Sequence, residues 1–345
     1  MLNAFRPGEL WLDTDGNRIR AHSAGIFYDD AASSWWWYGA DAYRKGAANR
    51  VINVYSSTDL YNWRFRGVAF EFKCWRAGAK ACYADRPKVV RNRAGRLVMW
   101  IKATPFVAVA VAATPLGPFS FVAQWYPNGE PMGDPTAFID PVTGDGWWIY
   151  SVRPDPSRRR VVRLCKMTQD LTNLTGIATT ISQGLEAPAV FYDPAVRRYF
   201  LWFSHCSGWA PNAAAAFSAP SLLATSWRPE GNPTRSATTF DSQSTFVLPL
   251  ATREGTRFIY IADRFKAQME TDPESGRYVW LPIEVSREGH LSVAWRATWT
   301  LDALGTLLRP PAPPSSPPPP RSPPPPPSPT TPPMAPPLPS PPPPA

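Results

Sequence analysis

The stretch EAPAVFYDPAVRRYFLWF, from Glu186 to Phe203, contains the unit from which the body of the chain is built. A polar residue comes first, an apolar strand follows, an Asp-Pro turn reverses the chain, and a second strand carries a tryptophan. Four more segments share this layout: HSAGIFYDDAASSWWWYG from His22, DRPKVVRNRAGRLVMWI from Asp85, DPTAFIDPVTGDGWWIY from Asp134 and QSTFVLPLATREGTRFIYI from Gln243. Each has an apolar residue four places after its polar leader (Ile26, Val89, Phe138, Val190, Val247) and an aromatic on its second strand (Trp37, Trp100, Trp148, Trp202, Tyr260).

The five leaders are 63, 49, 52 and 57 residues apart. Periods of roughly 40–50 residues, each holding several short strands, are typical of propeller blades. Five units therefore predict an all-β fold, a five-bladed β-propeller, with a β-sandwich as the alternative. Helical periodicity is nearly absent, and the alanine-rich stretch 212–217 is the clearest candidate for a helical turn.

Proline divides the chain into two parts, because 23 of the 43 prolines lie in residues 310–345. We expect the propeller to span residues 8–303 and a disordered, proline-rich tail of low complexity to span 304–345. The tail resembles hydroxyproline-rich wall glycoproteins of green algae and plants. That likeness implies an extracellular or cell-wall location and contact with wall material, although the first residues contain no signal peptide. A spacer and an SH3-type ligand are the alternatives for the tail.

Charge and cysteine content argue against several other classes of protein. The net charge of +9 comes from scattered arginines, and the densest run, Arg158 to Arg160, is expected to be a solvated loop. We therefore expect no nucleic-acid partner. No run of 18 apolar residues occurs, so no membrane span is predicted. The four cysteines have no CxxC spacing, which argues against a zinc site, and a bridge between Cys74 and Cys82 stays open.

The polar leaders are the candidate functional residues. In a propeller the innermost strand of each blade lines the central channel, so the five leaders are expected to meet at one mouth: His22, Asp85, Asp134, Glu186 and Gln243. Polar side chains in such a place need partners or a ligand. A ring of acids and amides suits a polyol, and hydrolysis of a glycoside needs a proton donor. Glu186 is the candidate acid, because apolar neighbours and the carboxylates of Asp134 and Asp85 raise the pKa of such a group.

Longer motifs carry a resemblance to a known family. The segment LEAPAVFYDPAVRRYFLWFSHCSGWAPN from Leu185, together with DSQSTFVLPL from Asp241, IADRF from Ile261 and DRPKVV from Asp85, resembles glycoside hydrolase family 43. The likeness is greatest to the exo-β-1,3-galactanase subfamily and runs from about Glu9 to Leu301. It implies a five-bladed propeller and an inverting, exo-acting enzyme that releases galactose from β-1,3-galactan, the backbone of arabinogalactan.

The resemblance also implies roles for single residues. Glu186 matches the catalytic acid, and Gln243 stands where the subfamily uses a glutamine, either to position the water or as an unusual base. The residues expected to bind substrate are Asp134, Asp85, His22, Cys206, Trp209, Asn212, Trp280 and Tyr38. Asp263 and Arg264 are expected to form an ion pair that braces the last blade. No cofactor is expected and no motif indicates a metal, although a channel calcium, as in some relatives, stays open.

The chain departs from the subfamily pattern in the first three blades. Ala40 stands where a glutamate is usual, and Asp85 is one methylene shorter than the usual glutamate. Two alternatives to a galactan hydrolase therefore stay open. One is a carbohydrate-binding propeller with lost or weakened turnover, and the other is a family 43 hydrolase for a different galactose, arabinose or xylose linkage.

Overall fold

The computed structural model describes residues 1–41, 49–73, 84–155, 157, 159–182, 184–208, 210–264 and 277–308. All of these belong to one compact unit, Met1–Pro313. Five subjects of the sequence predictions lie outside the described residues: Cys74, Cys82, Arg158, Trp209 and the tail from residue 309 onward.

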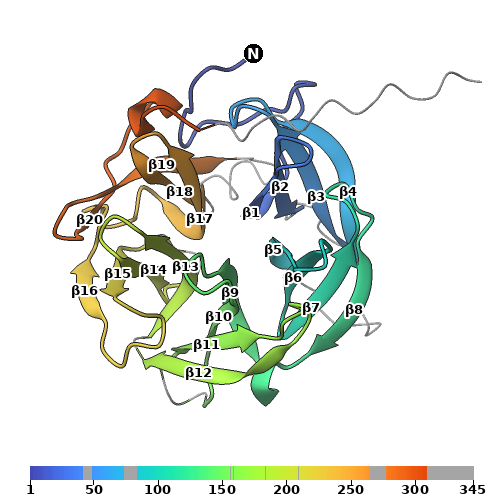
Figure 1. Cartoon of the computed structure of the whole chain (residues 1–345), viewed down its shortest axis with the longest axis vertical. Helices are drawn as coiled ribbons and strands as arrows, with labels where there is room; N and C mark the ends of the chain where they lie inside the picture. The colour runs from blue at the N-terminus through green and yellow to red at the C-terminus, as the bar shows by residue number, and fades with distance from the viewer. Residues whose placement is uncertain are drawn as a thin grey trace, which may run out of the picture. The chain divides into compact units, whose positions relative to one another are not determined.

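The described chain forms five four-stranded antiparallel sheets around a central channel, and each sheet uses four consecutive strands (Figure 1). This arrangement confirms the five-bladed propeller and excludes the β-sandwich. Blades one and two contain β1 (His22–Asp29), β2 (Ser34–Ala40), β3 (Asn49–Ser57), β4 (Arg64–Lys73), β5 (Asp85–Arg91), β6 (Leu97–Ala103), β7 (Phe106–Ala112) and β8 (Ser120–Trp125). Blades three and four contain β9 (Met132–Ile139), β10 (Gly146–Val152), β11 (Val161–Met167), β12 (Leu174–Ser182), β13 (Leu185–Asp193), β14 (Arg198–His205), β15 (Ala214–Ala219) and β16 (Arg228–Gly231). Blade five contains β17 (Ser242–Thr252), β18 (Gly255–Arg264), β19 (Tyr278–Val285) and β20 (Leu291–Ser292).

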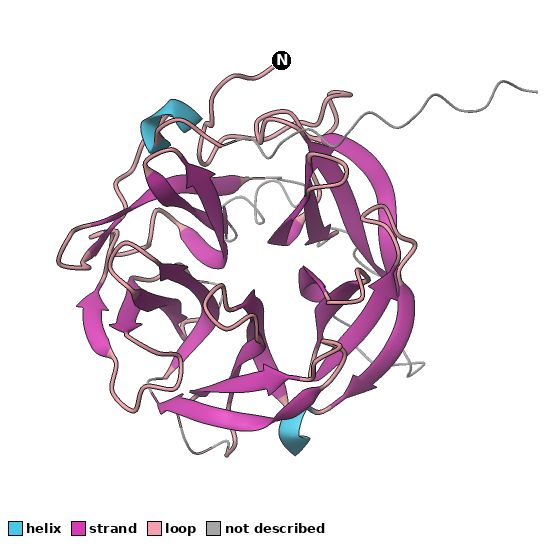
Figure 2. Cartoon of the chain, in the orientation of Figure 1, coloured by secondary structure: helices cyan, strands magenta, loops and turns pink. Residues whose placement is uncertain are grey.

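Strands account for nearly all the regular structure, as Figure 2 shows. The two helical pieces are short 3₁₀ turns, η1 (Pro127–Gly129) and η2 (Leu301–Leu304). Among the described residues no helix is long and apolar enough to cross a bilayer.

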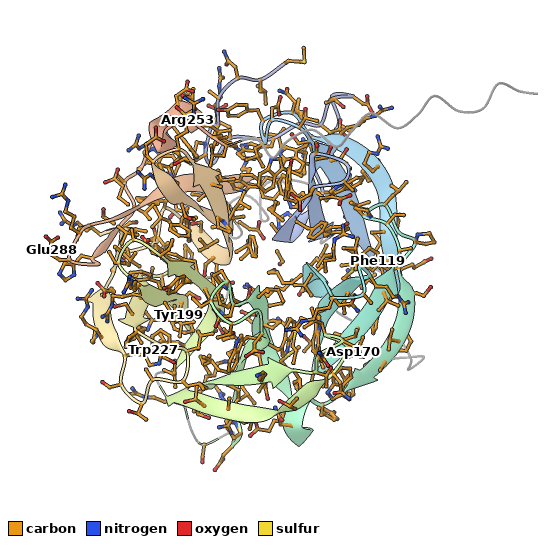
Figure 3. The ribbon with its side chains drawn as sticks, viewed as in Figure 1. Phe119, Asp170, Tyr199, Trp227, Arg253 and Glu288 are labelled. Carbon is orange, nitrogen blue, oxygen red and sulfur yellow. The ribbon has the colours of Figure 1, made fainter. Side chains whose placement is uncertain are left out.

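The repeated aromatics occupy the second strand of each blade and are almost fully buried: Trp37, Trp100, Trp148, Trp202 and Tyr260. Backbone carbonyls accept from two of the indoles: Trp37 Nε1 donates to Ala21 O (3.0 Å) and Trp100 Nε1 donates to Leu171 O (2.8 Å). Side chains fill the space between neighbouring blades throughout (Figure 3). Tyr199, labelled there, donates to both carboxylate oxygens of Asp140 at 2.9 and 3.0 Å and so joins blade four to blade three. The sequence repeat therefore arises because each blade needs one large buried group against its neighbour.

The first and last blades meet through an aromatic cluster, and among the described residues each of these blades uses four consecutive strands of its own. Phe5 pairs with Trp299 in an isolated bridge, and both side chains are buried. The Trp280 ring lies 5.0 Å from Trp37 and 5.2 Å from Trp11, centroid to centroid. Trp280 is therefore a ring-closing core residue, and the prediction that it stacks on a sugar is wrong.

The alanine-rich stretch is a strand, so the predicted helical turn is wrong. β15 pairs with β14 over its whole length, and Ala216 lies opposite Trp202. Ala214 and Ala216 are buried where the large indole leaves little room. Pairing and packing outweigh the helical preference of alanine, because local propensity is a weak prior.

Candidate active site

The inner strands β1, β5, β9, β13 and β17 surround the channel (Figure 1), and residues at the start of each of them line the same cavity. Each strand has a register shift within its first few residues, which is the signature of a β-bulge. In three strands the bulge contains a residue with positive φ: Ser23, Arg86 and Ala187. A bulge bends its strand and re-aims the side chains beside it, so the same irregularity in every blade turns polar groups into the channel.

These side chains line a cavity of about 450 Å³, which we call the polar mouth. The five leaders singled out by the repeat all line it: His22, Asp85, Asp134, Glu186 and Gln243. The remaining lining residues are Ser23, Arg86, Lys102, Thr104, Pro131, Met132, Gly133, Arg153, Arg160 and Gly208. The four cations in this set were not among the predicted site residues.

Glu186 and Gln243 are in direct contact. Gln243 Nε2 donates to Glu186 Oε1 at 3.4 Å and to Ser204 Oγ at 2.8 Å. They stand on neighbouring strands, β13 and β17, and do not face each other across a sugar-sized space. The two leaders therefore share one cavity, as expected, but they contact each other directly and leave no room for a sugar between them.

Arg86 is the central residue that sequence reasoning missed. It is 3% exposed, and it donates to Gln243 Oε1 at 2.8 Å and to Ser244 O at 3.0 Å. Its Nε also lies 3.2 Å from Asp134 Oδ1. A guanidinium donates only, so the amide oxygen of Gln243 must face it and the amide nitrogen must face Glu186. The sequence did contain a signal for this residue, since Arg86 stands at the start of an otherwise apolar strand. A buried arginine needs partners, so an arginine in such a place indicates a polar contact.

Asp134 remains ionised. Lys102 Nζ lies 2.6 Å from its Oδ1, and Arg86 approaches the same carboxylate. Burial opposes ionisation, but the charges of Arg86 and Lys102 outweigh it and hold the pKa of Asp134 well below its usual range. Asp134 thus acts as a fixed negative charge and not as a proton donor.

Glu186 has the opposite environment. Burial is the largest cause that raises the pKa of Glu186, and the negative charge of Asp134 raises it further. The positive charges of Arg160 and Arg86 act in the opposite direction and lower the pKa. Arg160 Nε lies 3.6 Å from Glu186 Oε2. Two carboxyl groups in one cavity are thus driven apart in pKa, which is the pattern of an acid beside an ionised partner.

His22 and Asp85 line the mouth from blades one and two. His22 is buried, with Nδ1 3.7 Å from Asp263 Oδ2, and the Ser23 backbone N–H donates to the same Asp263 oxygen. Asp263 therefore joins blade five to blade one. Arg264 points elsewhere, donating to Phe240 O and covering the Trp295 ring, so the predicted Asp263–Arg264 ion pair is wrong. Asp85 is half-buried, and its side chain has no hydrogen bond or ion pair to a described residue.

Three other predicted sugar contacts have structural roles or lie outside this cavity. Tyr38 is buried in the core and donates to Pro115 O, so it does not line the mouth. Asn212 is occupied by bonds to the backbone of His205 and to Ser207 Oγ, and it shapes the loop that carries Cys206. Cys206 is exposed and donates to Gly184 O at 3.4 Å. It does not line the cavity, but its thiol lies close enough to Glu186 to lower the pKa of that carboxyl group. Ala40 is buried opposite His22.

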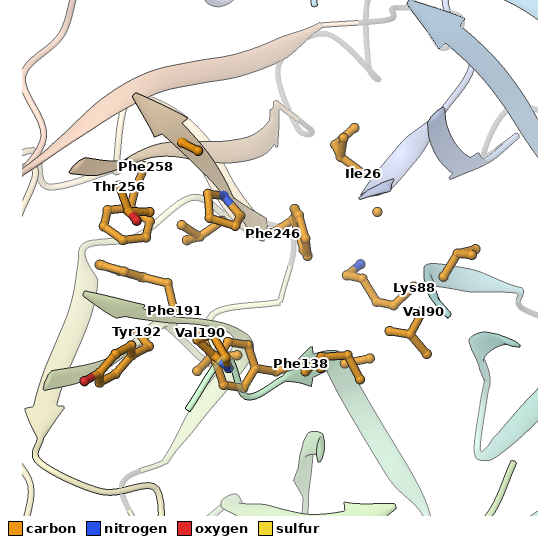
Figure 4. Close-up of a pocket in the computed structure, with 18 of the residues that line it drawn as sticks. Ile26, Lys88, Val90, Phe138, Val190, Phe191, Tyr192, Phe246, Thr256 and Phe258 are labelled. Atoms are coloured by element: carbon orange, nitrogen blue, oxygen red, sulfur yellow. The ribbon is translucent and has the colours of Figure 1, made fainter. Parts of the chain in front are cut away.

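The far half of the channel is apolar (Figure 4), a chamber of about 570 Å³. Its walls include all five apolar residues that follow the leaders: Ile26, Val89, Phe138, Val190 and Val247. Lys88 reaches into this chamber, and its buried Nζ donates to Ser23 O at 3.2 Å. The five polar leaders are thus confined to the polar mouth. Among the described residues no cluster of three or more His, Cys, Asp or Glu side chains could hold a metal ion.

Comparison with known proteins gives matches among solved structures, whereas no protein-family model and no curated protein matches the chain. A family 43 β-1,3-galactosidase with galactodeoxynojirimycin is 28% identical with a TM-score of 0.73, covering 86% of this chain and 100% of its own. An exo-β-1,3-galactanase from Phanerochaete chrysosporium with β-1,3-galactotriose is 29% identical with a TM-score of 0.75, covering 89% of this chain and 71% of its own. An exo-β-1,3-galactanase from Clostridium thermocellum is 26% identical with a TM-score of 0.73, covering 86% and 66%. Fold and likenesses thus agree that the chain is a glycosidase that resembles the exo-β-1,3-galactanases of glycoside hydrolase family 43.

Proposed function

We propose that the chain releases galactose from the ends of β-1,3-linked galactan, with Glu186 as the general acid. The observation that carries this proposal is the environment of Glu186: a carboxyl group in the polar mouth whose pKa is raised beside an ionised aspartate. Such a group stays protonated to a higher pH than an ordinary glutamate, which favours its role as the donor of a proton to a leaving oxygen. The substrates of the similar solved structures support the choice of linkage.

Gln243 orients groups in this proposal and does not accept a proton. An amide becomes a base only through its imidic tautomer, which places a hydrogen on the oxygen. That hydrogen would face Arg86, which can donate but cannot accept. The 2.8 Å bond from Arg86 therefore favours the ordinary amide, whose N–H groups hold Glu186 and Ser204 in position.

Asp85 is the carboxylate best suited to activate the water. It enters the mouth from blade two, which is not adjacent to the blade of Glu186, and it forms no ion pair with a described side chain. Inverting enzymes separate acid and base by roughly 6.5–9.5 Å so that sugar and water fit between them. A contact of 3.4 Å between Glu186 and Gln243 leaves no such space, which supports a base on another blade.

Hydrolysis of β-1,3-galactotriose tests the proposal. We expect galactose to appear first as the α-anomer by NMR, and Glu186→Gln to lower kcat by roughly 10²–10⁴-fold, the usual contribution of a general acid. Asp85→Asn should abolish turnover with azide restoring it as galactosyl azide, whereas Gln243→Ala should keep a measurable rate. Binding of the trisaccharide without any product from the unaltered protein would favour the alternative, a carbohydrate-binding propeller. The proline-rich composition of residues 310–345 supports an extracellular or cell-wall location as part of this proposal.

A further inference from the structure

The arginine-rich segment RPDPSRRR, from Arg153 to Arg160, connects β10 to β11. The run from Arg158 to Arg160 within it was expected to be a solvated loop, but Arg160 lines the polar mouth, and so does Arg153 at the start of the segment. The topology explains this position. β9 starts at the mouth and β10 runs antiparallel to it, so β10 ends at the mouth and Arg153, the residue directly after it, lines the cavity.

Arg160 and Arg153 differ in how they are held. Arg160 packs so closely on β9 that a Cβ built on Gly133 would lie 2.5 Å from its Nη1. Its Nε is buried, lies 3.6 Å from Glu186 and makes no hydrogen bond to a described residue. Arg153 lines the same cavity with an exposed side chain, and no described residue pairs with it. One arginine is thus fixed beside the acid, and the other is available at the rim.

Among the described residues the charges in the mouth do not balance. Four cations of this part of the chain line the cavity (Arg86, Lys102, Arg153, Arg160) against three carboxyl groups (Asp85, Asp134, Glu186). Two of the cations, Arg86 and Lys102, are matched to Asp134. When Glu186 is protonated for catalysis, Arg160 loses its ion pair, and the Asp134 carboxylate whose charge it also feels is already paired with Arg86 and Lys102. A neutral galactan would leave both loop arginines without an ion pair of their own.

We propose that Arg153 and Arg160 form an anion-recognising subsite at the rim of the mouth, which selects galactan carrying a carboxylate or sulfate ester on the sugar. This inference rests on the proposed function and specifies the substrate further. Arginine suits both groups, because its planar guanidinium donates two parallel hydrogen bonds to two oxygens of a carboxylate or sulfate. A loop supplies this specificity while the strands below it hold the acid.

The test measures binding, so that it does not depend on turnover. Galactose, galacturonic acid and galactose 6-sulfate are titrated calorimetrically into the Glu186→Gln protein at low ionic strength. We expect at least one anionic sugar to bind about five- to tenfold more tightly than galactose, as for a charge-assisted contact that is partly open to water. We expect 0.5 M NaCl to remove most of the preference. A preference for galacturonic acid alone indicates a uronic acid substituent, and one for the sulfate alone indicates a sulfated galactan.

Three variants make the result specific. Arg153→Gln should bring the anionic-to-neutral affinity ratio close to one, and Arg153→Lys should retain part of it because the charge remains. Arg159→Gln, a neighbour on the same loop that does not line the mouth, is the matched control and should keep the full ratio. Equal affinity for all three sugars, or a preference that survives Arg153→Gln, would overturn the proposal. Galactotriose hydrolysis is scored separately, so an anion preference without hydrolysis refutes only the proposed function.

Discussion

Replacing Arg160 with glutamine should move the pH dependence of catalysis upward. Arg160 Nε lies 3.6 Å from Glu186 Oε2 and opposes the raised pKa of that acid. At this distance Coulomb's law gives about 1.2 kcal/mol at the permittivity of water and about 4.6 kcal/mol at an effective value of 20. The Arg160 side chain is 29% exposed, so screening places the effect near the lower figure.

The sign follows from the role of the group. Glu186 must be protonated to act as an acid, so kcat/KM falls when the pH rises through its pKa. Removing a nearby positive charge destabilises the carboxylate and raises the pKa of Glu186. The alkaline limb of the kcat/KM profile on β-1,3-galactobiose should therefore move up by about one pH unit in Arg160→Gln, since about 1.4 kcal/mol corresponds to one unit.

Arg159→Gln is the control for this measurement, because Arg159 belongs to the same loop but does not line the mouth. Its alkaline limb should coincide with that of the unaltered protein. A limb that stays in place in Arg160→Gln, or moves to lower pH, would show that Glu186 is not the group titrated in that limb.

Three further predictions concern stability and the mouth. Trp280→Ala should lower the free energy of unfolding by about 3–5 kcal/mol in urea titration, as expected for a buried aromatic; a loss below 1 kcal/mol would contradict its ring-closing role. Tyr199→Phe leaves the buried Asp140 carboxylate short of a donor and should cost about 1–3 kcal/mol; an unchanged urea midpoint would be inconsistent with this contact. The lowered pKa of Asp134 means that its pairing stabilises the fold fully above the ordinary aspartate pKa and less as the pH falls through the folded value. Unfolding free energy should therefore fall less steeply on acidification in Asp134→Asn than in the unaltered protein, and parallel curves would rule this contribution out.

Much of the fold could be predicted from the sequence, because each blade repeats the same local pattern of apolar and aromatic residues. A short apolar strand, a turn and a strand with a large aromatic recur five times, and every blade needs those groups in the same places. The polar leaders are visible in the sequence for the same reason: a polar residue at the start of an apolar strand is costly unless it faces a channel or a partner. Tyr38 and Trp280 were misassigned because an aromatic in a core and one on a sugar-binding face look alike in sequence.

Only the tertiary structure decided which side chains of the polar mouth form hydrogen bonds and ion pairs with one another. Three blades supply the residues that contact one another there: Arg86, Lys102, Asp134 and Gln243. Their contacts depend on β-bulges, which cannot be predicted from the residue types. The direct contact between Glu186 and Gln243, and the position of Arg160 beside the acid, join residues 57 and 26 positions apart in the chain. Sequence spacing fixes which blade a side chain belongs to, but electrostatic pairing depends on distances of a few ångströms, and these are set by how the blades pack.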